Sequence, residues 1–97
     1  MSQGWTAIDA NLIKSIITKH FPHARVLVFG SRLKGNFKET SDLDLCLKAD
    51  KPLDLAAWTL LEEELSQTDI PFKVDLCDWF RIAEEFREHV QQSSIEL

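Results

Sequence analysis

The sequence lacks several features that would place it in common classes of protein. Its 97 residues include no tyrosine and only two cysteines, Cys46 and Cys77. Two cysteines make neither a disulfide framework nor a zinc knuckle. Each follows an aspartate, Asp44 or Asp75, by two positions, so we expect reduced, buried thiols beside these aspartates on neighbouring strands, with a regulatory disulfide as the alternative. No apolar run exceeds a few residues, which excludes a membrane-spanning segment. Residues 1–5 lack the basic start and apolar block of a signal peptide, so the expected compartment is the cytoplasm.

Positive charge is also scarce outside one region. The net charge is −5, and residues 53–97 carry three basic against eleven acidic side chains, whereas residues 25–52 carry six basic against four acidic. The chain therefore lacks the positive field of a duplex-binding protein, and no direct nucleic-acid binding is expected. The length and the 44% hydrophobic fraction predict a single domain over residues 1–97.

The residues that can carry chemistry gather in one stretch, residues 30–44. The apolar run Val26–Phe29 before it is typical of a buried strand. Residues 42–47 alternate with a period of two, so their leucines share the core face of a second strand. Asp42 and Asp44 then point together from the opposite face.

This stretch combines a cation site with an anion site. Two adjacent carboxylates are unfavourable unless a cation such as Mg²⁺, which prefers oxygen ligands, neutralises them. Upstream, Gly30 and Ser31 open a short helix that offers backbone N–H groups, a hydroxyl and a positive helix end to an anion. Arg32, Lys34 and Lys38 add positive charge nearby. Such a pairing is the machinery of phosphoryl or nucleotidyl transfer.

Two further polar residues have open interpretations. Asp75 lies within a predicted strand, where a buried carboxylate needs either a metal or a salt bridge to a neighbouring lysine or arginine. Ser41 either contacts a site carboxylate or phosphate or is an ordinary turn hydroxyl.

The remaining pattern predicts a small α/β (α+β) fold. The order α-β-α-β-α-β-α implies a three-stranded mixed sheet flanked by helices, and the direction of the third strand is left open. The expected elements are a helix over 6–20, a strand over 25–29, a short helix ending at a left-handed Gly35, a strand over 42–47, a helix from Lys51-Pro52 to Leu65, a strand over 72–77 and a helix over 79–92, with frayed residues 93–97.

The predicted helices carry apolar stripes and recognisable ends. Thr6 and Asp9 form an imperfect capping box at the first helix. Residues 62–64, three glutamates, are either a solvated helix face or a contact for a basic partner. The expected core positions are Ile8, Leu12, Ile13, Ile16 and Ile17 in the first long helix, Leu53, Ala56, Ala57, Leu60, Leu61 and Leu65 in the second, and Trp79, Ile82, Ala83, Phe86 and Val90 in the last.

The motif closely resembles a known signature. Gly30-Ser31, a basic residue, Gly35 and then Ser41-Asp42-x-Asp44 are similar to the pattern of the DNA polymerase β-like nucleotidyltransferase superfamily. More narrowly, the chain resembles the minimal nucleotidyltransferases (MNT) that act as antitoxins to HEPN-domain toxins. One departure is Lys34, where many relatives carry arginine, so charge is kept but a bidentate grip on phosphate is lost. The resemblance covers roughly residues 8–90, including Pro71–Leu76, Trp79 and Phe86-Arg87.

The resemblance implies a polymerase β palm-like fold and a specific reaction. It implies Mg²⁺-dependent transfer of AMP from ATP to a tyrosine hydroxyl of a partner HEPN RNase toxin. In that reaction Asp42 and Asp44 hold one or two Mg²⁺ ions, and Asp75 shares the metal and receives the proton of the attacking hydroxyl. The implied nucleotide-binding residues are Gly30, Ser31, Arg32, Lys34 and Ser41.

Two other classes of function stay open. One is a non-catalytic antitoxin that neutralises its toxin by binding alone, through the acidic C-terminal half. The other is a subunit of a small-molecule nucleotidyltransferase of the antibiotic-modifying kind. The three aspartates argue against the first, and the length of the chain argues against the second. A homodimer and a hetero-oligomer are both compatible with the sequence.

Overall fold

The computed structural model describes residues 4–97 as a four-stranded sheet with helices on both faces. The strand order is β3-β2-β1-β4, with β1 antiparallel to β2 and β4, and β2 parallel to β3. The elements are α1 (Ala7–His20), β1 (Arg25–Phe29), α2 (Ser31–Lys34), β2 (Leu43–Lys48), α3 (Leu55–Ser66), β3 (Val74–Asp78), the 3₁₀ turn η1 (Trp79–Arg81), α4 (Glu84–Ser93) and β4 (Ile95–Glu96).

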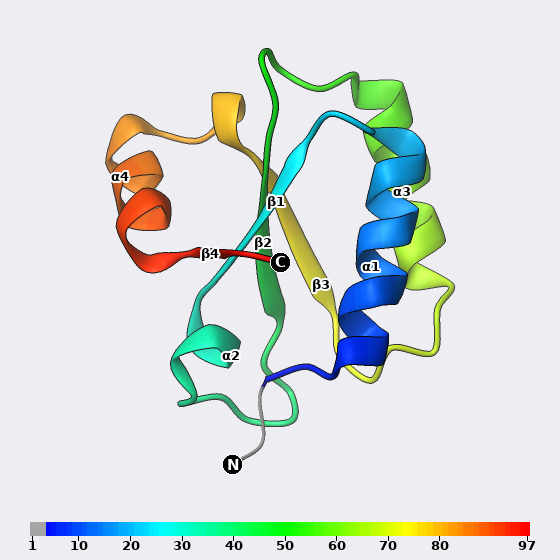
Figure 1. The fold of residues 1–97 in the computed structure, drawn as a ribbon, viewed down its shortest axis with the longest axis vertical. Helices are drawn as coiled ribbons and strands as arrows, with labels where there is room; N and C mark the ends of the chain where they lie inside the picture. Colours follow the sequence, from blue (N-terminus) through cyan, green and yellow to red (C-terminus); the bar gives the residue numbers. More distant parts are fainter. Residues whose placement is uncertain (1–3) are drawn as a thin grey trace.

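The two faces of the sheet are covered differently. α1 and α3 lie side by side on one face, and α2 and α4 lie on the other (Figure 1). The sequence left the direction of the third strand open. In the structure β3 runs parallel to β2, and α3 forms the crossover connection between the two strands. The predicted mixed sheet is confirmed, with one strand more than expected.

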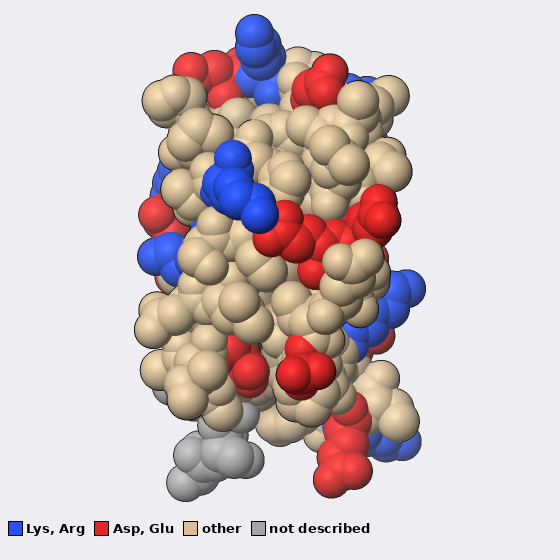
Figure 2. All heavy atoms as spheres, turned by 90° about the vertical axis from the view of Figure 1, so that its right-hand side faces the viewer, with Lys and Arg blue, Asp and Glu red and all other residues tan. Residues whose placement is uncertain are grey.

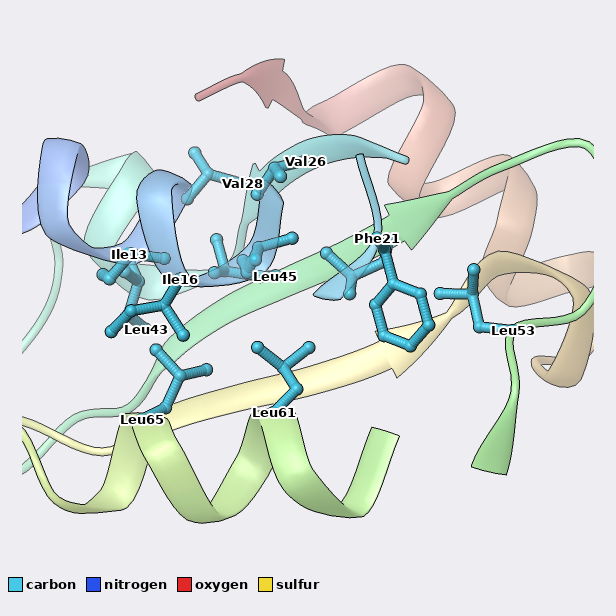
Figure 3. Close-up of a cluster of buried hydrophobic side chains, with 12 residues drawn as sticks. Ile13, Ile16, Phe21, Val26, Val28, Leu43, Leu45, Leu53, Leu61 and Leu65 are labelled. Atoms are coloured by element: carbon cyan, nitrogen blue, oxygen red, sulfur yellow. The ribbon is translucent and has the colours of Figure 1, made fainter. Parts of the chain in front are cut away.

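The main core lies between the sheet and the α1–α3 layer (Figure 3). Leu43, Leu45 and Leu47 are fully buried in it, as the alternation of β2 predicts. The predicted stripe of α1 is only partly correct, because Ile8 is 80% exposed and Leu12 is 39% exposed. At about 100° per residue, Ile8 lies roughly 130° around the helix from the buried face. The buried residues of α1 are Ile13, Ile16 and Ile17.

The second long helix begins later than predicted. The Asp54 carboxylate accepts a hydrogen bond from the Ala57 N–H and is the N-cap, so Pro52 lies before the helix. Leu53, also before the helix, is buried in the core, whereas Leu60 and Ala56 are exposed.

The predicted last helix is divided in two. Asp78 is 4% exposed and accepts hydrogen bonds from the Leu53 and Phe80 N–H groups, which ends β3 and starts η1. Ala83 is in an extended conformation, so α4 begins only at Glu84. Of the expected core positions here, Val90 is fully buried, whereas Phe86 and Ala83 are exposed.

The C-terminal residues are ordered as a strand, which corrects the prediction of a frayed end. Ile95 pairs with Val28, and the Leu97 N–H donates to the Val26 carbonyl at 2.8 Å. A two-residue strand is too short to show a periodicity, so pairing with β1 rather than local sequence determines it.

The outer face of α1 and α3 has scattered charges of both signs (Figure 2). Glu64 of α3 joins the two helices, because its carboxylate contacts Lys19 Nζ at 2.7 Å and His20 Nε2 at 2.9 Å. These hydrogen bonds lower the pKa of Glu64. Glu62 and Glu63 are exposed, as expected of a solvated face. Within residues 4–97, no helix is long and apolar enough to cross a membrane.

Candidate active site

The sheet register brings the predicted carboxylates together. Phe29 of β1 pairs with Asp44 of β2, and Asp44 pairs with Asp75 of β3, so the three side chains lie in a row across the sheet. We call the carboxylates of Asp42, Asp44 and Asp75 the carboxylate row. The row lies on the face opposite the main core, because Leu43 and Leu45 on either side of Asp44 point into that core. Asp42 precedes β2 directly and is half-buried, like Asp44. Two strands distant in sequence thus supply adjacent carboxylates.

Asp44 carries its charge in an unfavourable environment. Burial raises the pKa of Asp44 above its ordinary value, and the negative charges of Asp75 and Asp42 raise it further. Asp75, in contrast, is exposed on the edge strand, which corrects the premise that it must be buried. The salt-bridge alternative also finds no support, since among residues 4–97 no ion pair involves Asp75.

Gly30 lies against the carboxylate of Asp44. It has φ +84°, and a Cβ built on it would collide with the Asp44 Oδ2. Only glycine therefore allows β1 to turn into α2 while Asp44 stays in its place. The close approach leaves the backbone at the start of α2 next to the carboxylate row.

α2 is a single turn of helix between two glycines. The Lys34 N–H donates to the Gly30 carbonyl at 3.1 Å, and the Gly35 N–H donates to the Ser31 carbonyl at 2.9 Å. Gly35 is left-handed with φ +91°, so the predicted C-cap is confirmed. Within this turn, Ser31 is half-buried and Lys34 is exposed.

Arg32 is occupied elsewhere. Its guanidinium is buried and donates to the carbonyl oxygens of Ser41 at 2.8 Å, Gly4 at 2.8 Å and Glu39 at 3.0 Å. It also lies over the Phe72 ring, 4.2 Å from the ring centroid. Arg32 therefore organises the loop between α2 and β2, and we do not include it among the proposed phosphate contacts.

Ser41 also has a turn role. Its hydroxyl accepts from the Lys38 N–H at 2.9 Å, and its N–H donates to the Lys38 carbonyl at 3.0 Å. The structure thus favours the turn-hydroxyl interpretation. Arg32 and Ser41 together hold the loop that delivers Asp42 to the sheet.

The carboxylate row fits a hard divalent cation by its chemistry. In the described part of the chain, no three His, Cys, Asp or Glu side chains already surround one point in metal-binding geometry. The row nevertheless offers only oxygen donors, and burial, followed by the charges of Asp75 and Asp42, raises the pKa of Asp44. These are the properties that Mg²⁺ or Ca²⁺ would match.

Sequence reasoning missed one wall of the site. A hollow of about 380 Å³ contains Gly30, Asp44 and Asp75 on its floor and Phe86 and His89 of α4 on its side. The last helix was expected to bury Phe86, but η1 shifts α4 so that this ring reaches the hollow. No periodicity distinguishes a residue that lines a site from one that lines a core.

The cysteines lie on the same face as the carboxylates. Cys46 pairs directly with Cys77 in the register, and both are free thiols, as predicted. A hydrogen bond with Cys46, together with burial, raises the pKa of the Cys77 thiol. Cys46 packs with Leu27 and Val90 beneath α4, so the pair serves as packing beside the site.

This combination of a carboxylate row, a glycine turn and a mixed sheet defines a nucleotidyltransferase. The family described as "Polymerase beta, Nucleotidyltransferase" matches residues 11–97, and the chain belongs to that family. The predicted fold and the predicted resemblance to minimal nucleotidyltransferases are confirmed.

Individual relatives make the class more specific. The chain is 42% identical over 81 residues to the "Probable protein adenylyltransferase MntA" of Haemophilus influenzae, covering 84% of this chain and 71% of that protein. This relative supports the prediction of an adenylyltransferase.

Solved structures that are similar to this chain come from toxin–antitoxin complexes. A crystal structure of a toxin–antitoxin with AMP-PNP superimposes with a TM-score of 0.72 at 25% identity, covering 89% of this chain and 69% of that one. A tri-AMPylated Shewanella oneidensis HEPN toxin in complex with an MNT antitoxin has a TM-score of 0.67 at 21% identity, covering 92% and 68%. At that identity the second likeness is evidence for the fold.

Proposed function

We propose that this chain transfers AMP from ATP to a tyrosine hydroxyl of a HEPN-family toxin, in a Mg²⁺-dependent reaction, and thereby acts as an antitoxin. The observation that carries the proposal is the register pairing of Asp44 with Asp75, directly beside the Gly30 turn. It supports the proposal because Gly30, Asp44 and Asp75 line one hollow, and carboxylates can hold a cation or accept a proton.

The reaction assigns a separate task to each group. Asp42, Asp44 and Asp75 would hold Mg²⁺, which neutralises triphosphate charge and polarises phosphoryl oxygens. The backbone N–H groups at Ser31, with Lys34, bind the β- and γ-phosphates. A bond forms between the tyrosine oxygen and the α-phosphorus, and the bond from that phosphorus to pyrophosphate breaks. Asp75 is exposed, lines the hollow and takes the phenol proton.

The acceptor must come from another protein, because the chain has no tyrosine. Two comparisons support a protein partner: the relative is named a protein adenylyltransferase, and the AMP-PNP structure is a toxin–antitoxin. At 25% or more identity, these likenesses extend beyond the fold alone.

The test uses the chain co-expressed with the product of its neighbouring gene. We expect the wild-type chain, with ATP and Mg²⁺, to add one or more AMP masses to that protein by intact mass spectrometry. The Asp75→Asn variant should abolish the mass increase while the two proteins still co-purify, because a single exposed carboxylate contributes little to the interface. Asp50→Asn, which changes an exposed aspartate in a loop outside the hollow, is the matched control and should transfer AMP normally.

The same experiment separates chemistry from sequestration. If Asp75→Asn protects cells from the toxin as well as the wild-type chain does at matched expression, binding alone is the operating mechanism. If the wild-type chain modifies no tyrosine of any partner, the acceptor assignment is wrong.

A further inference from the structure

Two rings of α4 line the hollow beside the carboxylate row. Phe86 and His89 lie one helical turn apart, with ring centroids 5.9 Å apart and planes inclined by 33°. Both rings meet Phe29 edge-on, at 5.5 Å and 6.3 Å. We call Phe86 and His89 the aromatic wall.

The aromatic wall is exposed rather than part of a core. Phe86 is 39% exposed and His89 is also exposed, whereas Val90, the next residue of α4, is fully buried. The helix is therefore anchored by Val90 and leaves the wall free to meet a ligand. The second, smaller core cluster beneath α4 includes neither ring of the wall.

The position of the wall relative to the Gly30 turn restricts what the wall can contact. The turn follows Phe29 directly, both rings of the wall pack on Phe29, and the wall lines the same hollow as Gly30, Asp44 and Asp75. A nucleophile attacks the α-phosphorus from the side opposite to the leaving pyrophosphate. An acceptor hydroxyl that approaches through this hollow passes the wall on its way to Asp44 and Asp75.

We propose that the aromatic wall of Phe86 and His89 holds the phenol ring of the acceptor tyrosine and sets its angle of attack. This inference rests on the proposed function and specifies how this chain selects an aromatic hydroxyl over serine or threonine. Tilted and edge-to-face arrangements are the ones that aromatic pairs prefer, and they add to the burial of ring area. A planar ring that lies along the wall places its hydroxyl towards Asp44 and Asp75.

The first experiment measures binding without chemistry. The probes are a short peptide with a central tyrosine and its phenylalanine and leucine counterparts, added to the full chain with AMP-PNP and Mg²⁺. NMR of the His89 imidazole should show ring-current shifts with the tyrosine and phenylalanine peptides and none with the leucine peptide. His89→Ala should weaken the tyrosine peptide roughly fivefold to tenfold, in keeping with the usual strength of one aromatic contact. His23→Ala, in an exposed turn outside the hollow, is the matched control.

The second experiment tests whether Phe86 and His89 act through their aromatic rings or in another way. With the tyrosine peptide as acceptor, His89→Ala and Phe86→Leu should raise the KM for the peptide several-fold and change kcat less. His89→Phe should restore the KM, because it keeps a ring while removing the imidazole. Phe86→Leu keeps the apolar packing against Phe29, so a normal thermal unfolding midpoint excludes simple misfolding.

Three outcomes would overturn the inference. A loss of AMP-PNP affinity in His89→Ala without a loss of peptide affinity would assign the wall to the adenine ring. Equal binding of the leucine peptide, or unchanged KM values in both variants while the wild-type chain transfers AMP, would reject the wall and leave the proposed function standing. Selective, His89-dependent binding of aromatic peptides without any AMP transfer would keep the wall and reject the proposed function.

Discussion

Asp44 shows how single residues here are arranged for chemistry at some expense of stability. Its carboxylate is half-buried, directly opposite Asp75 and close to Asp42. Each of these conditions favours the protonated form. In the absence of a cation, the folded chain therefore holds a charge that would be more favourable in the unfolded chain.

The first prediction concerns Asp44→Asn. The folded-state pKa of Asp44 is raised from 3.8, so its ionisation opposes folding, and this penalty appears as pH rises through the interval above 3.8. With a chelator present, the variant should gain thermal stability over the wild type as pH rises from about 3 to 7, with the smallest difference at the acidic end. AMP transfer should be lost. A stability difference that shrinks as pH rises would contradict the assigned electrostatics.

The second prediction compares two glycines that both have positive φ, Gly30 at +84° and Gly35 at +91°. Gly30→Ala should reduce both stability and ATP binding, because the new Cβ collides with Asp44 in addition to straining the backbone. Gly35→Ala should cost about 1–2 kcal/mol of unfolding free energy from left-handed strain alone, since no atom lies within 4 Å of its Cβ position. It should leave ATP affinity nearly unchanged. Urea unfolding and calorimetric titration with AMP-PNP measure the two effects. Normal ATP binding by Gly30→Ala would show that the phosphate turn is misplaced.

At the scale of residues, the sequence predicted which residues lie near one another. It did not predict which side chains are already hydrogen-bonded within the chain. Gly30, Asp42, Asp44 and Asp75 could be selected from alternation and spacing. The engagement of Arg32 could not, because its partners are backbone carbonyls of a loop whose path no periodicity describes. A basic residue in a phosphate motif and one that holds a loop look alike in sequence.

At the scale of elements, Asp78 joins two segments that are distant in sequence. Its carboxylate accepts from the Leu53 N–H at 2.8 Å and the Phe80 N–H at 3.0 Å, and Arg81 contacts it at 3.3 Å. The Arg81 guanidinium also donates to the Leu53 carbonyl at 2.9 Å. The end of β3 is therefore attached to the segment that leads into α3.

The third prediction follows from this joint. Asp78→Ala leaves the Leu53 N–H without its buried acceptor and should cost about 1–3 kcal/mol of unfolding free energy. Asp78→Asn keeps one acceptor oxygen and should cost less. Chemical denaturation followed by circular dichroism checks both. An unfolding midpoint for Asp78→Ala equal to that of the wild-type chain would mean that the joint is not needed for the fold.

The elements that the sequence predicted well are those with a clear period. β1 has the predicted bounds, α1 begins one residue later than predicted, and β2 is shifted by one residue at both ends. The predictions failed where a contact from elsewhere decides the structure. β4 exists because it pairs with β1, and the last helix is interrupted because Asp78 caps η1. The direction of β3 likewise depends on the crossover through α3, which local sequence does not encode.

At the scale of the whole molecule, the proposed reaction needs an acceptor from outside, because the chain has no tyrosine of its own. The fourth prediction is that the purified chain, given ATP and Mg²⁺, gains no AMP mass. Its serine and threonine hydroxyls are far less acidic than a phenol, whose pKa is about 10. Intact mass spectrometry over several hours checks this. Self-modification at a serine or threonine would show that the site does not require a phenol.

The two faces of β2 have an evolutionary consequence. One face contributes Leu43, Leu45 and Leu47 to the main core, and the other contributes Asp44 to the site. A substitution on the second face leaves the first intact, so genetic drift can remove catalysis while the chain continues to fold. A lineage of such chains would retain any benefit that comes from occupying a partner's surface. The loss of activity in this architecture is therefore one mutation away, whereas the loss of the fold requires damage to the other side of the same strand.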